Sequence, residues 1–138
     1  MAKKVLIVED NELNLRLFRD LLEAHGADVR TIRDAREAIE AIRAFAPQLV
    51  IMDIQLPHIS GVELIRTMKA DPQLDSIPVM AVTAYAGKGD EGRVRAAGAD
   101  AYVSKPISVS RFVLAVEGLA GPLGERIIPQ SRTQTPAV

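Results

Sequence analysis

Short apolar runs alternate with amphipathic segments along most of this chain. Four of the runs cover residues 5–8, 49–53, 77–82 and 101–104. A weaker run at 28–32 contains few large apolar residues. Runs this short, bounded by turn residues, are typical of strands buried on both faces of a sheet. We therefore predict one strand over each of these ranges.

Each predicted strand is followed by a segment whose apolar residues recur at helical spacing, which predicts a helix. The expected buried stripes comprise Leu17, Phe18, Leu21 and Leu22; Ala35, Ala38, Ile39 and Ile42; Leu64, Ile65 and Met68; Val94; and Phe112, Val116 and Leu119. The expected N-terminal caps are Asn11, Asp34 with Glu37, Ser60 with Glu63, and Ser108. The fourth helix, over 88–97, is glycine-rich and thinly apolar, so we expect it to be loosely held.

Strand and helix alternate five times, which indicates a parallel sheet with right-handed crossovers and helices on both faces. Gly121 and Pro122 end the last predicted helix. Beyond them the chain is rich in proline and polar residues, so we expect one domain over 1–121 and a flexible C-terminal tail over 122–138.

The composition excludes several classes of protein. The chain has 138 residues, of which 48% are hydrophobic and 25% charged, with a formal net charge of −1. This balance gives no bulk attraction to nucleic acid. Cysteine is absent, no apolar run approaches the ~20 residues of a membrane span, and the first apolar run is too short for a signal peptide. We therefore expect a cytoplasmic protein that neither binds nucleic acid nor inserts into a membrane.

Polar residues stand at the ends of four predicted strands: Glu9 with Asp10, then Asp53, Thr83 and Lys105. The loops at the carboxyl ends of parallel strands converge if the first and third strands are neighbours. One contact between like charges at ~4 Å is worth about 4 kcal/mol at an effective dielectric constant near 20. Either one acid is protonated or a cation lies among the acids. Because every ligand is an oxygen and no histidine joins the cluster, the cation that fits is Mg²⁺.

A carboxylate beside Mg²⁺, a lysine and a hydroxyl is arranged to accept a phosphoryl group. The metal ion and Lys105 would neutralise charge on the equatorial oxygens while Asp53 attacks phosphorus in line. Such a reaction depends on positioning and electrostatics more than on acid–base catalysis.

The segments 5–11 and 52–57, with Thr83-Ala84 and Lys105-Pro106, resemble the receiver domain of two-component response regulators. The resemblance covers residues 3 to about 120. It is carried by a pattern spread over several strand ends, which is far more specific than any one part. Within the family, the chain most strongly resembles single-domain regulators of cell division. The segments that carry this closer resemblance are 9–14, 53–57, 88–91 and 104–108.

The resemblance implies an α/β fold, a doubly wound (βα)5 or flavodoxin-like arrangement with a five-stranded parallel sheet in the order 2-1-3-4-5. It implies that Asp53 is the phosphoacceptor, served by a histidine kinase or a phosphotransfer protein. Mg²⁺ would be held by Asp10, Asp53 and the main-chain carbonyl of Gln55, with Glu9 as a ligand directly or through water.

Further roles follow from the same resemblance. Lys105 would contact a phosphoryl oxygen, and Thr83 would hydrogen-bond the phosphoryl group once it is attached. Tyr102 would turn inward as Thr83 moves. The bond between Lys105 and Pro106 is expected to be cis.

The function that we predict is a phosphorylation switch that binds other proteins. We expect it to catalyse only its own phosphorylation and dephosphorylation. We expect a monomer or weak dimer, with partners contacting the fourth helix, fifth strand and fifth helix. Two other classes of protein fit the sequence less well. An aspartyl-nucleophile phosphatase would have a second acid at the position of Gln55. A flavin carrier would bind phosphate after the first strand, where Glu9 and Asp10 would repel it. A protein-binding adaptor that works without phosphorylation is the remaining alternative.

Overall fold

A five-stranded parallel sheet forms the centre of the protein. The computed structural model describes residues 2–83, 90–104 and 108–123. The strands are β1 (Lys4–Val8), β2 (Asp28–Ile32), β3 (Leu49–Asp53), β4 (Val79–Thr83) and β5 (Ala101–Ser104). They pair in the order β2-β1-β3-β4-β5, and every pair is parallel. The predicted fold class and strand order are therefore confirmed.

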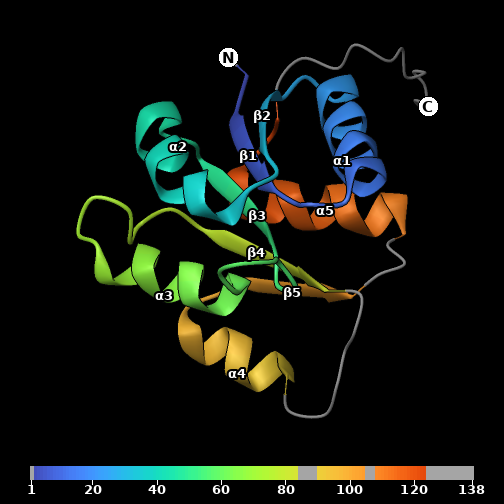
Figure 1. Cartoon of the computed structure of the whole chain (residues 1–138). Helices are drawn as coiled ribbons and strands as arrows, with labels where there is room; N and C mark the ends of the chain where they lie inside the picture. Colours follow the sequence, from blue (N-terminus) through green and yellow to red (C-terminus); the bar gives the residue numbers. More distant parts are fainter. Residues whose placement is uncertain (1, 84–89, 105–107, 124–138) are drawn as a thin grey trace, which may run out of the picture.

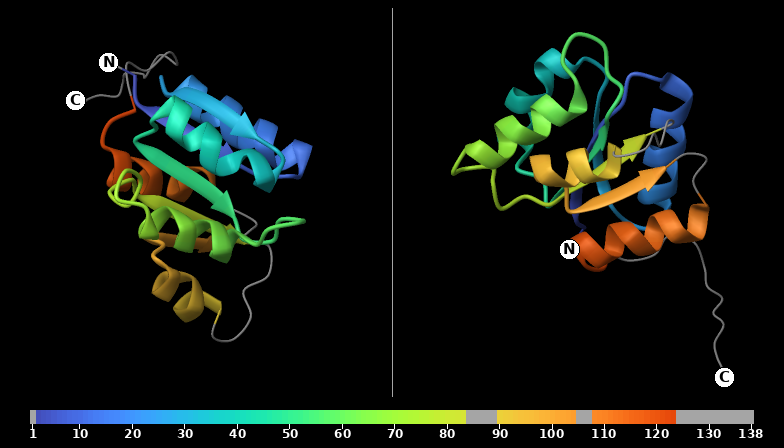
Figure 2. Two further views of the ribbon diagram at one scale, coloured as in Figure 1. Left: turned by 60° about the vertical axis from the view of Figure 1, so that its left-hand side comes forward. Right: turned by 90° about the horizontal axis from the view of Figure 1, so that it is seen from below.

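Helices cover both faces of this sheet (Figures 1 and 2). They are α1 (Glu12–Ala24), α2 (Ala38–Phe45), α3 (Gly61–Ala70), α4 (Asp90–Ala97) and α5 (Val109–Ala120), with a short 3₁₀ helix, η1 (Ala35–Glu37), before α2. Side chains of α1 and α5 share one apolar core with the sheet, and those of α2, α3 and α4 share a second core on the opposite face. No helix in the described part of the chain is long and apolar enough to cross a membrane.

Two of the predicted helix caps are present as expected. The side chain of Asn11 accepts a hydrogen bond from the backbone N–H of Asn14 at 3.0 Å, and Ser60 Oγ accepts one from Glu63 at 3.2 Å. Both bonds satisfy N–H groups that lack a partner within the first helical turn.

The other two caps differ from the prediction. Asp34 accepts from the backbone N–H of Arg36 at 2.9 Å, so it caps the 3₁₀ turn η1, and Glu37 makes no side-chain capping bond where α2 begins. Ser108 precedes α5 without a side-chain bond to the helix backbone. These helix starts therefore depend more on packing than on capping.

The buried stripe of α1 also differs from the prediction. Leu15, Phe18 and Leu22 are buried, whereas Leu17 is 54% exposed. The sequence of this helix contains two overlapping apolar stripes, and only one of them can face the sheet. A residue distant in the sequence determines which stripe faces the sheet. The ring of Phe18 stacks on that of Phe112, with centroids 5.0 Å apart.

The fourth strand begins later than its apolar run. The N–H of Ile77 bonds the carbonyl of Leu74 in a turn, so β4 begins at Val79. Pro78 has no N–H to donate, but its carbonyl accepts from Val50 N at 3.0 Å. From Val79 the strand extends to Thr83, which places Thr83 at the carboxyl edge of the sheet.

The chain remains packed on the domain after α5 ends. Leu123 is 1% exposed and lies in the core shared with α1 and α5, and its carbonyl accepts a hydrogen bond from Lys3 N at 2.8 Å. Residues 124–138, which make up most of the predicted tail, lie outside the described residues. The same holds for Lys88 and Gly89, where the fourth helix was predicted to begin.

Candidate functional site

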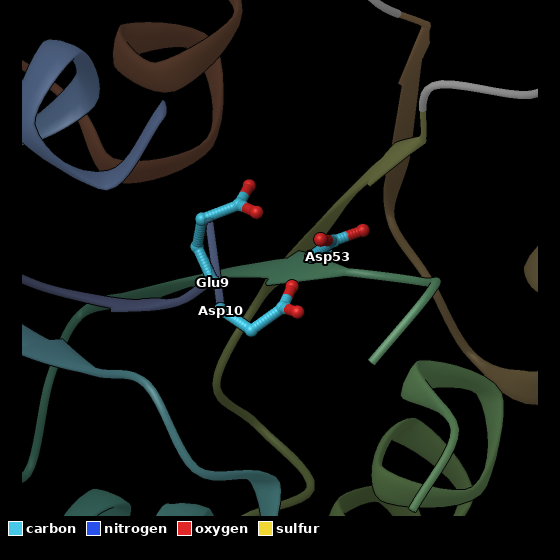
Figure 3. Close-up of side chains that lie close together, drawn as sticks. All are labelled: Glu9, Asp10 and Asp53. Carbon is cyan, nitrogen blue, oxygen red and sulfur yellow. The ribbon is translucent and has the colours of Figure 1, made fainter. Parts of the chain in front are cut away.

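Three carboxylates meet at the carboxyl edge of the sheet. Glu9 and Asp10 follow β1 directly, and Asp53 is the last residue of the neighbouring strand β3. Val8 lies opposite Met52 in the ladder, so the next residues along both strands come together at this edge. Glu9, Asp10 and Asp53 each offer a carboxylate oxygen, and these atoms lie within 4.8 Å of one another (Figure 3).

Backbone N–H groups fix two of these carboxylates. Glu9 and Asp53 are buried, at 1% and 5% exposure, while Asp10 is half-buried. Glu9 Oε2 accepts from Asn11 N at 3.2 Å, and Asp53 Oδ1 accepts from Gln55 N at 3.0 Å. Hydrogen bonds of this kind stabilise a carboxylate that has been removed from water.

The donor set of this cluster suits a hard divalent cation. Every candidate ligand is a carboxylate oxygen, and such oxygens are what Mg²⁺ prefers in proteins. The charge of a cation would offset the mutual repulsion of these acids. The residues therefore fit a magnesium ion, with Glu9, Asp10 and Asp53 as the groups able to hold it.

Thr83 stands next to this cluster on the adjacent strand. Asp53 pairs with Val82 in the ladder, so Thr83 lies one residue farther along β4 at the same edge. Thr83 is 2% exposed and lines a cavity of about 480 Å³, together with Gln55, Arg66 and Arg93. Thr83 is therefore buried at the edge of the sheet that carries the acids.

The loop from β3 to α3 passes very close to Asp53. Gly61 N donates to the carbonyl of Ile54 at 3.1 Å, and a Cβ at position 61 would lie 2.5 Å from the backbone oxygen of Asp53. Any side chain at this position would collide with the backbone that carries Asp53. Gly61 is thus part of the site, although the sequence pattern indicated only that it lies within the predicted helix cap of Ser60 and Glu63.

A second cavity opens beside Asp10. Its volume is about 340 Å³, and its lining also includes Arg33, Asp34, Pro57 and His58. The backbone of His58 has φ 73°, in the left-handed region. Sequence reasoning missed this cavity, because its walls come from the loops after three different strands, β1, β2 and β3.

The remaining predicted site residues are placed as follows. Gln55 is exposed in the loop after β3, and Tyr102 is half-buried in β5, opposite Ala81, against the core of α2, α3 and α4. Lys105 and Pro106 lie outside the described residues. Ser104 pairs with Thr83, so the chain enters that segment at the edge of the sheet that carries the acids.

Comparison with known proteins agrees with this geometry. Residues 5–117 match the response regulator receiver domain. The polar-differentiation response regulator DivK of Brucella anthropi is 52% identical over 121 residues, which is 88% of this chain and 98% of the relative.

Solved structures are similar as well. A receiver domain of a Pseudomonas aeruginosa sensor histidine kinase, with a magnesium ion coordinated in its active site cleft, aligns at TM-score 0.80 and 26% identity, covering 88% of this chain and 99% of that one. A response regulator from Chloroflexus aurantiacus aligns at TM-score 0.83 and 26% identity, covering 87% and 98%. This chain belongs to the response regulator receiver family.

Proposed function

We propose that Asp53 accepts a phosphoryl group from a histidine kinase or a phosphotransfer protein, and that this modification switches the binding of other proteins. The observation that carries the proposal is the buried carboxylate of Asp53 at a strand end, with oxygens of Glu9 and Asp10 within 4.8 Å. A nucleophile so placed is held rigidly by β3 on one side and by Gly61 on the other.

Each residue near Asp53 has a role in this proposal. The Gln55 N–H fixes the rotation of the Asp53 carboxylate through the 3.0 Å bond to Oδ1. Asp10, Asp53 and the main-chain carbonyl of Gln55 hold Mg²⁺, with Glu9 as a ligand directly or through water. When bound, the ion supplies positive charge to the oxygens of the phosphoryl group in transfer.

Lys105, Thr83 and Tyr102 complete the switch. In this proposal Lys105 contacts a phosphoryl oxygen, and Thr83 donates a hydrogen bond to the phosphoryl group as Tyr102 turns inward. Phosphorylation adds roughly −1.5 to −2 charge, and one charge-assisted hydrogen bond contributes about 1.5–3 kcal/mol. One or two such bonds shift a two-state equilibrium about tenfold to several hundredfold.

An apolar surface on α1 and α5 is suited to binding a protein partner. Leu13 and Leu17 on α1, and Val109 and Leu114 on α5, are all more than half exposed. Helix α1 begins two residues after Asp10, so this surface borders the acid cluster. A phosphoryl donor that packs on it would bring its phosphorylated side chain to Asp53.

The relatives indicate the process that the switch serves. The DivK proteins are named for polar differentiation, and we infer a role in cell-division or cell-cycle signalling. The partners are histidine kinases or phosphotransfer proteins in the cytoplasm, and the switched surface comprises α4, β5 and α5. The chain acts as a monomer or weak dimer, and its catalysis is confined to its own phosphorylation and dephosphorylation.

Incubation with acetyl phosphate tests this function. Intact mass spectrometry should show a gain of one phosphoryl group on the native chain with Mg²⁺ and no gain after chelation. The Asp53→Asn variant should show none in either condition. A native chain that stays unmodified, but binds a kinase as well as Asp53→Asn does, would instead be an adaptor that works without phosphorylation.

A further inference from the structure

Two basic side chains line the cavity beside Asp10. Arg33 comes from the loop after β2, and His58 comes from the loop after β3. We propose that Arg33 and His58 bind the oxygens of anionic phosphoryl donors and guide them to Asp53, a role that rests on the phosphorylation of Asp53 proposed above.

The electrostatics of the site call for such groups. A phosphoryl donor is an anion, and it must approach a cluster of carboxylates whose charge repels it. A metal ion offsets part of that charge at the centre of the cluster. A positive guanidinium at the rim, with a further hydrogen-bond donor beside it, would offset more of it along the path of approach and raise the local concentration of donor.

Arg33 is held at the rim without being neutralised by a strong ion pair. Its nearest carboxylate is Glu12, at 3.8 Å, and both side chains are more than 60% exposed. Contacts of this kind are weak. The guanidinium therefore retains N–H donors for a phosphoryl oxygen, while Glu12 keeps it beside the first turn of α1.

Arg36, three residues along, provides the contrast. Its Nε and Nη2 donate to the two oxygens of Asp34 at 3.0 and 2.8 Å, and it does not line the cavity. Both arginines are exposed and both belong to the stretch between β2 and α2. Because Asp34 lines the cavity, loss of Arg36 would also leave a negative charge there without its partner. Arg16, which is exposed on α1 and does not line the cavity, is therefore the control for the loss of one nearby positive charge.

The backbone of His58 supports a role for its side chain. A residue other than glycine is strained in the left-handed region, and glycine or asparagine would fit the turn at lower cost. Strain of this kind is frequent at sites that bind ligands. The imidazole gives the cavity an N–H donor from the β3–α3 loop, in addition to the guanidinium from the loop after β2.

In the reaction with acetyl phosphate, the bond from phosphorus to the acetyl oxygen breaks and acetate leaves with that electron pair. A carboxylate oxygen of Asp53 forms the new bond to phosphorus. Arg33 and His58 act on the incoming donor at the rim of the site, so we expect them to affect the capture of the donor and to leave the later hydrolysis of the aspartyl phosphate unchanged.

The test compares phosphorylation rates of Arg33→Gln, His58→Asn and the double variant, with acetyl phosphate as the probe and saturating Mg²⁺. Asparagine tolerates the left-handed backbone, so it removes the imidazole without adding strain. Arg16→Gln is the control, and Arg33→Lys restores the charge. The half-life of the aspartyl phosphate is measured on each variant after the donor is removed.

We expect the second-order rate constant of the double variant to fall about threefold to tenfold at low salt, and less at high salt because exposed charges are screened. Arg33→Lys should recover most of the rate, Arg16→Gln should match the native chain, and the half-lives should be unchanged. Equal rates in the native chain and the double variant overturn the donor-binding role alone. Absence of phosphorylation in the native chain overturns the proposed function itself.

Discussion

Gly61 lies so close to Asp53 that a Cβ atom at position 61 would be 2.5 Å from the Asp53 backbone oxygen. It would also lie 2.7 Å from Cα of Ile54. Both obstacles are backbone atoms that cannot rotate away. The first turn of α3 and the end of β3 are therefore fitted to each other through a residue without a side chain.

Replacing Gly61 with alanine should destabilise the domain and displace Asp53. Overpacking of this kind costs about 1–3 kcal/mol of unfolding free energy, which urea denaturation would measure. Gly118→Ala is the control, since nothing lies within 4 Å of a Cβ built there in α5. The control should gain about 0.5–1 kcal/mol. Equal stability of the two variants would contradict the close contact.

Neutralising one acid of the cluster should stabilise the protein when no divalent ion is present. Asp10→Asn removes one charge from a set of carboxylates within 4.8 Å of one another. The unfolding free energy in chelator should rise by about 1 kcal/mol, since Asp10 is half-buried and partly screened.

Added Mg²⁺ should then stabilise the native protein more than Asp10→Asn, because a ligand that binds only the folded state stabilises it by mass action. Thermal unfolding with and without Mg²⁺ measures both effects. A variant that gains as much from Mg²⁺ as the native protein does would remove Asp10 from the metal ligands.

The carboxylate of Asp34 should titrate well below its usual range. The hydrogen bonds from Arg36 lower the pKa of Asp34 from 3.8 to about 2. Because the folded pKa is the lower one, this contribution to stability is present above pH 3.8 and is lost as the pH falls towards 2. Arg36→Gln should move the pKa back towards 3.8, as followed by carbon NMR of the carboxyl group. Arg33→Gln should leave it nearly unchanged.

Leu123 should be part of the folding unit although it follows the last helix. Leu123→Ala removes a side chain that is 1% exposed in the core of α1 and α5, and comparable truncations cost about 2–5 kcal/mol. Leu114→Ala, at a site 69% exposed, should change stability by less than about 0.5 kcal/mol. A chemical denaturation series distinguishes the two. Similar small losses in both variants would contradict the packing of Leu123.

The sheet was predictable from the sequence because four of its five strands are short apolar runs with a polar residue at or just after the end. The run at 49–53 is buried throughout, as its composition indicates. Strand starts were less predictable. Ile77 has the character of a strand residue, yet its N–H is used in a turn with Leu74, a contact that no local pattern shows.

Helix orientation was predicted less well than helix position. In α1, Leu15 and Leu17 are both apolar, and either stripe satisfies helical spacing. The structure buries Leu15 because the stacking of Phe18 on Phe112 determines the rotation of the helix. Phe112 belongs to α5, so the decision depends on a tertiary contact.

The acid cluster was predictable for the same reason as the sheet, because parallel strands bring their carboxyl ends to one edge. The tight approach of Gly61 and the left-handed backbone of His58 were not predictable. Both features arise where separate loops meet, and their geometry depends on how the elements pack.

Trapping the acyl phosphate shows which residue carries the phosphoryl group. The chain is phosphorylated with acetyl phosphate and Mg²⁺ and then reduced with borohydride, which converts an aspartyl phosphate to homoserine, and the converted residue is located by peptide mass spectrometry. Our account predicts conversion at Asp53 alone, lost after chelation. Conversion at Asp10, or at any other carboxylate while Asp53 stays intact, would contradict it.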